Sequence, residues 1–145
     1  MKVILDTHIW VWWLLPGSPL PDRERLALDR IAADNGILLP AICLWEAQML
    51  HRKKRMELPV PFATWLRRAA APDMLNVLPL SADVVIAIDE LPARFHGDPA
   101  DRMIVATARA HELPLATHDA AIKKSRLVKL WKPERSKHER SKQVL

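Results

Sequence analysis

The chain has 145 residues, enough for one domain with its own hydrophobic core. Its single cysteine, Cys43, excludes an internal disulfide and suits a reducing compartment, so we expect a cytoplasmic protein. The apolar run from Ile9 to Leu15 is far shorter than the roughly 20 residues of a membrane span. Lys2 is followed by only three apolar residues before Asp6, which is too short a run for a signal peptide. We therefore expect no association with a membrane.

Charge is unevenly distributed along the chain, although the formal net charge is +5. Residues 123–145 contain nine lysines and arginines against two glutamates, which gives this segment a charge of +7. The first 122 residues carry 13 basic and 15 acidic side chains, a charge of −2. A basic segment can hold a polyanion near an acidic site, or it can simply keep the protein dissolved. We expect a single domain over residues 1–131 and a basic, flexible tail over residues 132–145.

The first predicted strand ends in a carboxylate. Val3, Ile4 and Leu5 follow one another without a polar break, as in a strand covered on both faces by helices. Asp6 comes directly after them. In parallel α/β sheets, ligands bind outside the carboxyl ends of the strands. Asp6 therefore stands where we expect the chemistry of this protein to take place.

A helix rich in tryptophan is predicted next, over residues 7–15, and the Pro-Gly-Ser-Pro sequence that follows ends it. Trp10 and Trp13 are three residues apart and therefore share a helix face. We expect these rings in the core. An interface with a second copy or with a partner protein would also suit the set.

Helices and strands alternate along the rest of the chain. Helices are predicted over residues 21–34, 41–50, 60–71, 81–91 and 98–110, and strands over residues 37–39, 76–78 and 113–117, with 127–130 as a candidate fifth strand. Such alternation predicts an α/β fold with a mainly parallel sheet.

Basic residues follow the helix predicted over residues 41–50. We expect this cluster, residues 51–55, to continue the same helix, either as a solvated helix end or as a contact for phosphates. The candidates for binding nucleic acid are Arg52, Lys53, Lys54 and Arg55, together with Arg102.

Five acidic residues occupy comparable places in the predicted fold. Asp6 ends the first strand, Asp119 lies just past the fourth, and Asp98 and Asp101 begin a helix. Glu46 follows the second strand by a turn or two of helix, where it could also face solvent. Because strand ends and the starts of the following helices share one edge of a parallel sheet, we expect these carboxylates to converge.

Converging carboxylates imply a bound cation. Like charges raise one another's pKa, so the cluster stays ionised only beside a positive charge. Oxygen ligands select hard divalent ions such as Mg²⁺ or Mn²⁺. Such ions bind phosphates and activate water for attack on a phosphodiester.

Asp98 and Asp101 have different expected roles. Asp98-Pro99 is typical of an N-cap followed by the first residue of a helix. Asp101 shares a helix face with Val105 and Ala108 and therefore points inward. We expect Asp101 to face the metal and Asp98 to cap the helix or support the site.

Other kinds of site find less support. The histidines have no zinc-type spacing with Cys43, and three scattered glycines cannot build a phosphate loop. No serine has a Gly-x-Ser-x-Gly setting. A receiver-like phospho-acceptor would need a pair of acids near the first strand, which offers only Asp6.

Four segments, taken in order, resemble PIN-domain proteins of the VapC toxin type. They are Val3-Ile4-Leu5-Asp6-Thr7-His8, Leu44-Trp45-Glu46, the run from His96 to Ala106, and Leu115-Ala116-Thr117-His118-Asp119. Each segment alone is a weak signal, and the four in this order and spacing are specific. The resemblance extends to about Trp131.

The resemblance implies an α/β/α sandwich with a short sheet of four or five mainly parallel strands. It also implies a Mg²⁺- or Mn²⁺-dependent endoribonuclease, usually a homodimer, that a cognate antitoxin protein neutralises. Carried over by position, the acidic quartet is Asp6, Glu46, Asp101 and Asp119, with Asp98 an additional acid. Thr7 and Thr117 would be hydroxyls that support these ligands.

Two further functions stay open. The same fold could serve as a non-catalytic module that binds RNA or protein, or as a metal-dependent phosphoesterase acting on DNA. A complete acidic set favours catalysis, because unpaired clustered acids are costly to keep.

Overall fold

A computed structural model describes residues 1–95 and 97–133 of the chain. The strands are β1 (Val3–Leu5), β2 (Ile37–Pro40), β3 (Asn76–Leu78) and β4 (Leu115–Ala116). The helices are α1 (Thr7–Leu14), α2 (Asp22–Ala33), α3 (Ile42–Arg52), α4 (Phe62–Ala69), α5 (Ala82–Asp89), α6 (Pro99–His111) and α7 (Ala120–Ser125).

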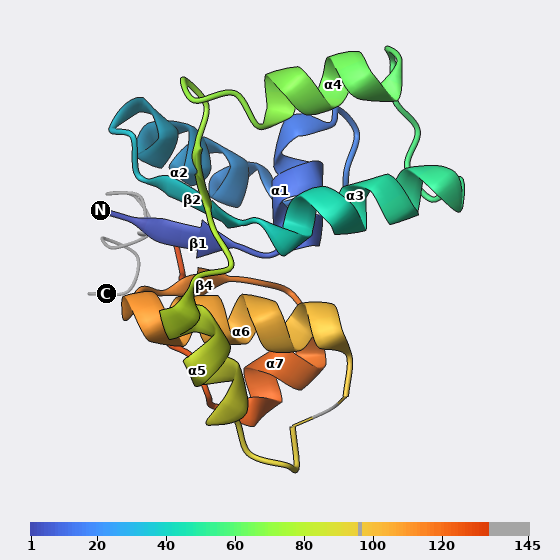
Figure 1. The fold of residues 1–145 in the computed structure, drawn as a ribbon. Helices are drawn as coiled ribbons and strands as arrows, with labels where there is room; N and C mark the ends of the chain where they lie inside the picture. The colour runs from blue at the N-terminus through green and yellow to red at the C-terminus, as the bar shows by residue number, and fades with distance from the viewer. Residues whose placement is uncertain (96, 134–145) are drawn as a thin grey trace, which may run out of the picture.

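The four strands form one parallel sheet in the order β3-β2-β1-β4. Ile4 of β1 lies opposite Leu38 of β2 on one side and Leu115 of β4 on the other. All three residues of β1 are fully buried, which explains their unbroken apolar run. In Figure 1, α1 to α4 lie above the sheet and α5 to α7 below it. The expected α/β/α arrangement is confirmed.

The candidate fifth strand is reduced to a single bridge. Leu130 pairs with Leu115 in an isolated parallel bridge, and the N–H groups of Leu115 and Trp131 donate hydrogen bonds of 2.8 and 2.9 Å on either side of it. Because β4 has only two residues, a neighbouring strand has too few partners to extend beyond this bridge. Helix α7 was not predicted from the sequence. Ile122 is its one buried residue, so it has no apolar periodicity to detect.

The expectation that the basic cluster continues helix α3 is confirmed for His51 and Arg52 and is wrong for residues 53–55. The helix ends at Arg52, and Lys54 takes a left-handed conformation with a φ of 55°. The N–H of Arg55 then donates to the carbonyl of Leu50 at 2.9 Å, and that of Lys54 to the carbonyl of His51 at 3.1 Å. These two bonds form a Schellman motif, which ends the helix and changes the direction of the chain at Lys54 and Arg55.

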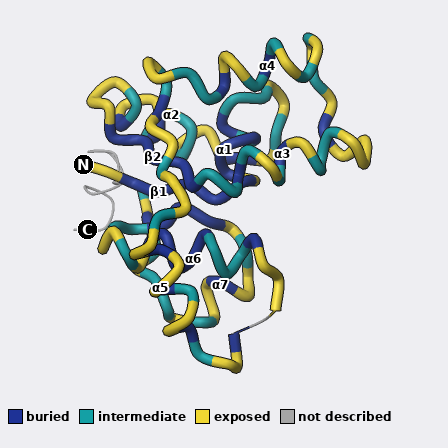
Figure 2. Tube along the Cα trace, viewed as in Figure 1, coloured by how far each residue is buried: buried dark blue, intermediate teal, exposed yellow. Residues whose placement is uncertain are grey.

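The core lies on both sides of the sheet, as the dark segments of Figure 2 show along β1, α1 and α6. Trp10 and Trp13 are 0% and 5% exposed, which confirms their place in the core. Their ring N–H groups donate to the carbonyl of Ala69 and to the carboxylate of Asp29. Among the described residues, no helix is long and apolar enough to cross a membrane. Of the predicted tail, residues 134–145 lie outside the described part of the chain.

Candidate active site

The five acidic side chains named from the sequence line one cavity of about 350 Å³ at the carboxyl edge of the sheet. In Figure 1, the arrow of β1 points to this edge, where α1, α3 and α6 begin. The cavity is lined by Asp6, Thr7, His8, Trp12, Glu46, Asp98, Asp101, Ile104, His118 and Asp119. Parallel topology therefore brings together carboxylates that are up to 113 residues apart in the sequence, counted from Asp6 to Asp119.

Three of these carboxylates cap helices. Asp6 accepts a hydrogen bond from the N–H of Ile9 at 2.9 Å, and Asp119 accepts one from the N–H of Ile122 at the same distance. Asp98 accepts from the second residue of α6, also at 2.9 Å. The positive ends of α1, α6 and α7 therefore face the cavity and favour negative charge in it. Capping also fixes each carboxylate in one orientation.

Two buried threonines hold the carboxylates in place. The hydroxyl of Thr7 donates to Glu46 across the cavity wall. Thr117 makes a side-chain hydrogen bond to Asp6, and its oxygen accepts from the N–H of Asp119 at 3.0 Å. Both threonines are buried, with exposed fractions of 3% and 9%. They occupy the supporting positions that the family resemblance implies.

Burial and mutual repulsion make ionisation costly in the absence of a cation. Burial raises the pKa of Asp6, and the charge of Asp119 raises it further, against hydrogen bonds from Thr117 and Ile9. Burial also raises the pKa of Glu46, with added repulsion from Asp98 and Asp6. A cation in the cavity would remove this penalty.

The two acids at the start of α6 have different surroundings. Asp98 is the exposed N-cap, bonded to the N–H groups of Ala100 and Asp101. Asp101 is half-buried one turn further on, and it lines the cavity beside Ile104.

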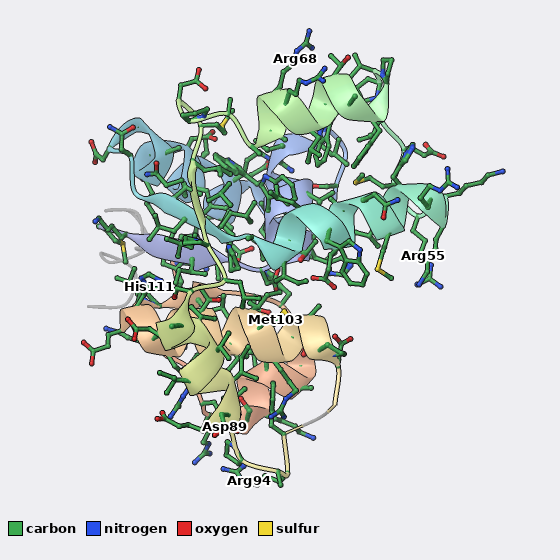
Figure 3. All side chains as sticks on the ribbon, viewed as in Figure 1. Arg55, Arg68, Asp89, Arg94, Met103 and His111 are labelled. Carbon is green, nitrogen blue, oxygen red and sulfur yellow. The ribbon has the colours of Figure 1, made fainter. Side chains whose placement is uncertain are left out.

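A second cavity, also of about 350 Å³, adjoins the first. The two share Thr7, His8, Trp12, Glu46 and Asp98 in their linings, so they form one continuous groove. The outer part of this groove is lined by Lys53 and Arg55, together with Val11, Met49, Leu50 and Met56. Figure 3 shows Arg55 beyond the end of α3, on the side of the molecule where α6 begins.

The other candidate nucleic-acid contacts lie elsewhere. Arg52 and Lys54 are exposed and do not line either cavity. The guanidinium of Arg102 donates to the carbonyl of Phe95 at 3.3 Å, which ties it to the loop before α6. Only Lys53 and Arg55 of the basic cluster thus reach the groove.

Sequence reasoning missed His8, Trp12 and His118 as part of this cavity. The spacing of His8 and Trp12, four residues apart, does place them on one helix face. His118 comes between two residues that were named for the site. Neither signal shows that the three rings meet at the same opening.

The donor set fits a hard divalent ion. Carboxylates dominate the cavity, and Mg²⁺ and Mn²⁺ prefer oxygen ligands. Within residues 1–95 and 97–133, no group of three His, Cys, Asp or Glu side chains is already placed to hold a metal directly. Mg²⁺ usually keeps several waters and binds through one or two carboxylates plus substrate phosphates, so it does not need such a cage.

Comparisons with known proteins agree on a family. A model of the PIN domain matches residues 3–126. The chain is also 32% identical over 125 residues to Ribonuclease VapC22 from Mycobacterium tuberculosis, a match that covers 86% of this chain and 92% of that protein.

Solved structures share the fold. The crystal structure of VapBC2 from Rickettsia felis, bound to a DNA fragment from their promoter, superposes with a TM-score of 0.68 and 21% identity over 90% of this chain and 98% of that one. FitAcB from Neisseria gonorrhoeae gives a TM-score of 0.68 and 20% identity over 91% and 98% of the two chains. At these identities the likeness establishes the architecture of the chain.

Proposed function

The chain belongs to the PIN domain family, and on this basis we propose that it is a divalent-metal-dependent endoribonuclease, the toxin of a toxin–antitoxin pair. One observation carries the proposal: five carboxylates from distant parts of the chain line a single cavity beside a groove with two basic residues. The relative of 32% identity, a ribonuclease by name, supports RNA as the substrate.

The charged and hydroxyl side chains of the groove have different parts in the proposed reaction. Asp6, Glu46, Asp101 and Asp119 would hold Mg²⁺ or Mn²⁺, with Asp98 capping α6 at the margin. The bound ion would supply a water of lowered pKa and positive charge for the scissile phosphate. Thr7 and Thr117 keep the carboxylates oriented, and Lys53 and Arg55 bind phosphates further along the RNA.

The proposed partners follow from the family and from its structural neighbours. The VapBC2 structure, which shares this fold, holds DNA from the promoter of its own genes, and this supports a cognate antitoxin for the present chain. We also propose a homodimer acting in the cytoplasm. Exposed apolar side chains at Trp45, Leu80 and Ile86, each 53–55% exposed, offer surface for a protein contact.

A cleavage assay tests the proposed activity. We expect the protein to cut single-stranded RNA in Mg²⁺ or Mn²⁺, to stop when EDTA is added, and to leave DNA of the same sequence intact. The same ions should raise the melting temperature, because an ion that binds only the folded state at 100 times its Kd stabilises it by about 2.7 kcal/mol.

The outcomes of this assay separate the alternatives. Cleavage of DNA would favour the phosphoesterase, and RNA binding without cleavage would favour a non-catalytic module. Calcium ions serve as a control for binding without efficient catalysis. Cleavage that persists in EDTA after dialysis would contradict the role assigned to the carboxylates.

The basic side of the groove yields a separate prediction. Replacing Lys53 and Arg55 together with glutamine should weaken RNA binding and make it less sensitive to salt. Each lost phosphate contact lowers the slope of log affinity against log salt by about 0.7 for a single strand. Fluorescence anisotropy of a labelled RNA at several salt concentrations measures the slope.

Arg52 and Lys54 provide the matched control, because they lie in the same segment and do not line the groove. The Arg52→Gln, Lys54→Gln double variant changes the net charge by the same amount. An equal loss of slope in both variants would show that only the overall charge matters.

A further inference from the structure

Three aromatic rings stand at the opening of the carboxylate cavity. His8, Trp12 and His118 all line it, and we call them the rim cluster. The ring of Trp12 lies between the two histidines, with centroid distances of 5.6 Å to His8 and 6.2 Å to His118. Trp12 is half-buried, in contrast to Trp10 and Trp13 of the same helix, which are in the core. Trp12 thus packs partly against the core and lines the cavity with the rest of its surface.

Helix α2 holds the rim cluster in position. The guanidinium of Arg25 donates to the carbonyls of Trp12 and Trp13 at 3.1 and 2.6 Å, and the hydroxyl of Ser18 also donates to the Trp12 carbonyl. His118 pairs through Nε2 with a carboxylate oxygen of Glu24 at 2.9 Å. These bonds fix the last turn of α1 and the His118 ring before any ligand binds.

The charges around the rim cluster suit a nucleotide chain. His8 and Trp12 line both cavities, so they lie where the cavity with Asp101 and Asp119 meets the cavity with Lys53 and Arg55. A strand with one phosphate at the carboxylate-bound ion and another at Lys53 or Arg55 runs along the stretch that the two cavities share, and Trp12 is the one large aromatic side chain among the described residues that line both. An aromatic face between two phosphate positions is the arrangement by which proteins bind single strands, through stacking of a base.

We propose that Trp12, supported by His8 and His118, stacks with the base of a nucleotide adjacent to the bond that is cut. This inference rests on the proposed ribonuclease function and adds a specificity-determining residue to it. Because a paired base cannot leave its helix without cost, the rim cluster selects single-stranded RNA over duplex.

The test combines a variant protein with a modified substrate. The substrate is a single-stranded RNA oligonucleotide that the wild type cuts in Mg²⁺ or Mn²⁺, prepared with an abasic residue at each nucleotide beside the cleaved bond. Loss of one stacked base should lower kcat/KM of the wild type by about 5- to 100-fold at one of these positions. Trp12→Ala should lose a similar factor on the intact RNA and lose nothing further on the abasic one.

Two further variants control for structural effects. Trp12→Phe keeps an aromatic face and should retain most of the activity and the penalty for the abasic residue. Leu26→Ala removes an exposed apolar side chain that does not line either cavity and should behave as the wild type. If Trp12→Ala fails to fold, by circular dichroism, the comparison of Trp12→Phe with Trp12→Leu gives the same contrast between ring and aliphatic side chain.

Equal cleavage of intact and abasic RNA by the wild type would overturn the stacking proposal. So would an unchanged kcat/KM in Trp12→Ala. If the wild type cuts no RNA with either ion, the proposed function fails, and the stacking proposal fails with it.

Discussion

Replacement of Asp6 by asparagine is expected to abolish RNA cleavage while leaving the fold intact. Asp6 is 6% exposed and lies in the cavity lining with four other carboxylates. Asparagine keeps the shape and can still cap α1 through the N–H of Ile9, because Asn is as good an N-cap as Asp. It loses the charge that an ion would need. We expect cleavage to fall by about 10³-fold or more, since removal of one oxyanion-hole donor already costs about 10²–10³-fold.

Although it abolishes cleavage, the same substitution should leave the stability of the metal-free protein unchanged or raise it. Burial raises the pKa of Asp6 above its ordinary value of 3.8. The stability that the protonated form contributes is therefore complete below this value and is lost as pH rises through the pKa of the folded state. The asparagine side chain does not ionise, so at neutral pH in EDTA the variant should melt at or above the wild-type temperature. The difference should vanish below about pH 3, where the aspartate is protonated in both states.

Thermal unfolding followed by circular dichroism, with parallel cleavage assays, measures both effects. Asp89→Asn is the control, because Asp89 ends α5, well apart from Arg55 in the view of Figure 3, and does not line either cavity. Retained metal-dependent cleavage in Asp6→Asn would remove Asp6 from the mechanism. A large drop in the melting temperature in EDTA would show that the charge supports the fold.

Asp101→Asn is expected to reduce cleavage about as severely as Asp6→Asn, whereas Asp98→Asn should cost only about 10–100-fold, the range seen for groups that support a metal ligand. Asp101 is half-buried and lines the cavity beside Ile104. Asp98 is exposed, and its carboxylate is bonded to two N–H groups of α6. Asparagine preserves this cap, so the Asp98 variant tests charge alone.

Asp98→Ala separates capping from charge. Loss of the cap should lower the free energy of unfolding by about 1 kcal/mol, which urea titration resolves, while Asp98→Asn should unfold as the wild type does. The titration of cleavage rate with Mg²⁺ then shows which acid binds the ion. A stronger dependence on Mg²⁺ in Asp98→Asn than in Asp101→Asn would reverse the roles of the two acids.

Local patterns sufficed for the carboxylates of the site. An apolar triplet followed by Asp6 indicates a buried strand and an acid at its carboxyl end, and Asp98-Pro99 indicates a capped helix start, because each depends on residues adjacent in the chain. Parallel topology then makes convergence at one edge a necessary consequence. The PIN resemblance and the α/β/α arrangement follow from the same four segments.

Other features depend on bonds that no short pattern encodes. The turn after α3 needs Lys54 in a left-handed conformation, which favours glycine, and no glycine marks it. Helix α7 has one buried side chain, so its apolar pattern is too short to detect. The predicted fifth strand is only a single bridge, because β4, the strand that it would pair with, has two residues.

Residue type and neighbours along the chain were enough to show which side chains are acidic, which strands end in them and which family the chain resembles. Long-range packing alone selected the basic residues that reach the groove, and it alone brought His8, Trp12 and His118 to one opening. These residues lie on α1, after β4 and in the turn after α3. Helix α1 packs against α3, and β4 pairs with β1, the strand that leads into α1. Contacts between segments more than a hundred residues apart produce no hydrophobic periodicity or short motif that the sequence alone would reveal.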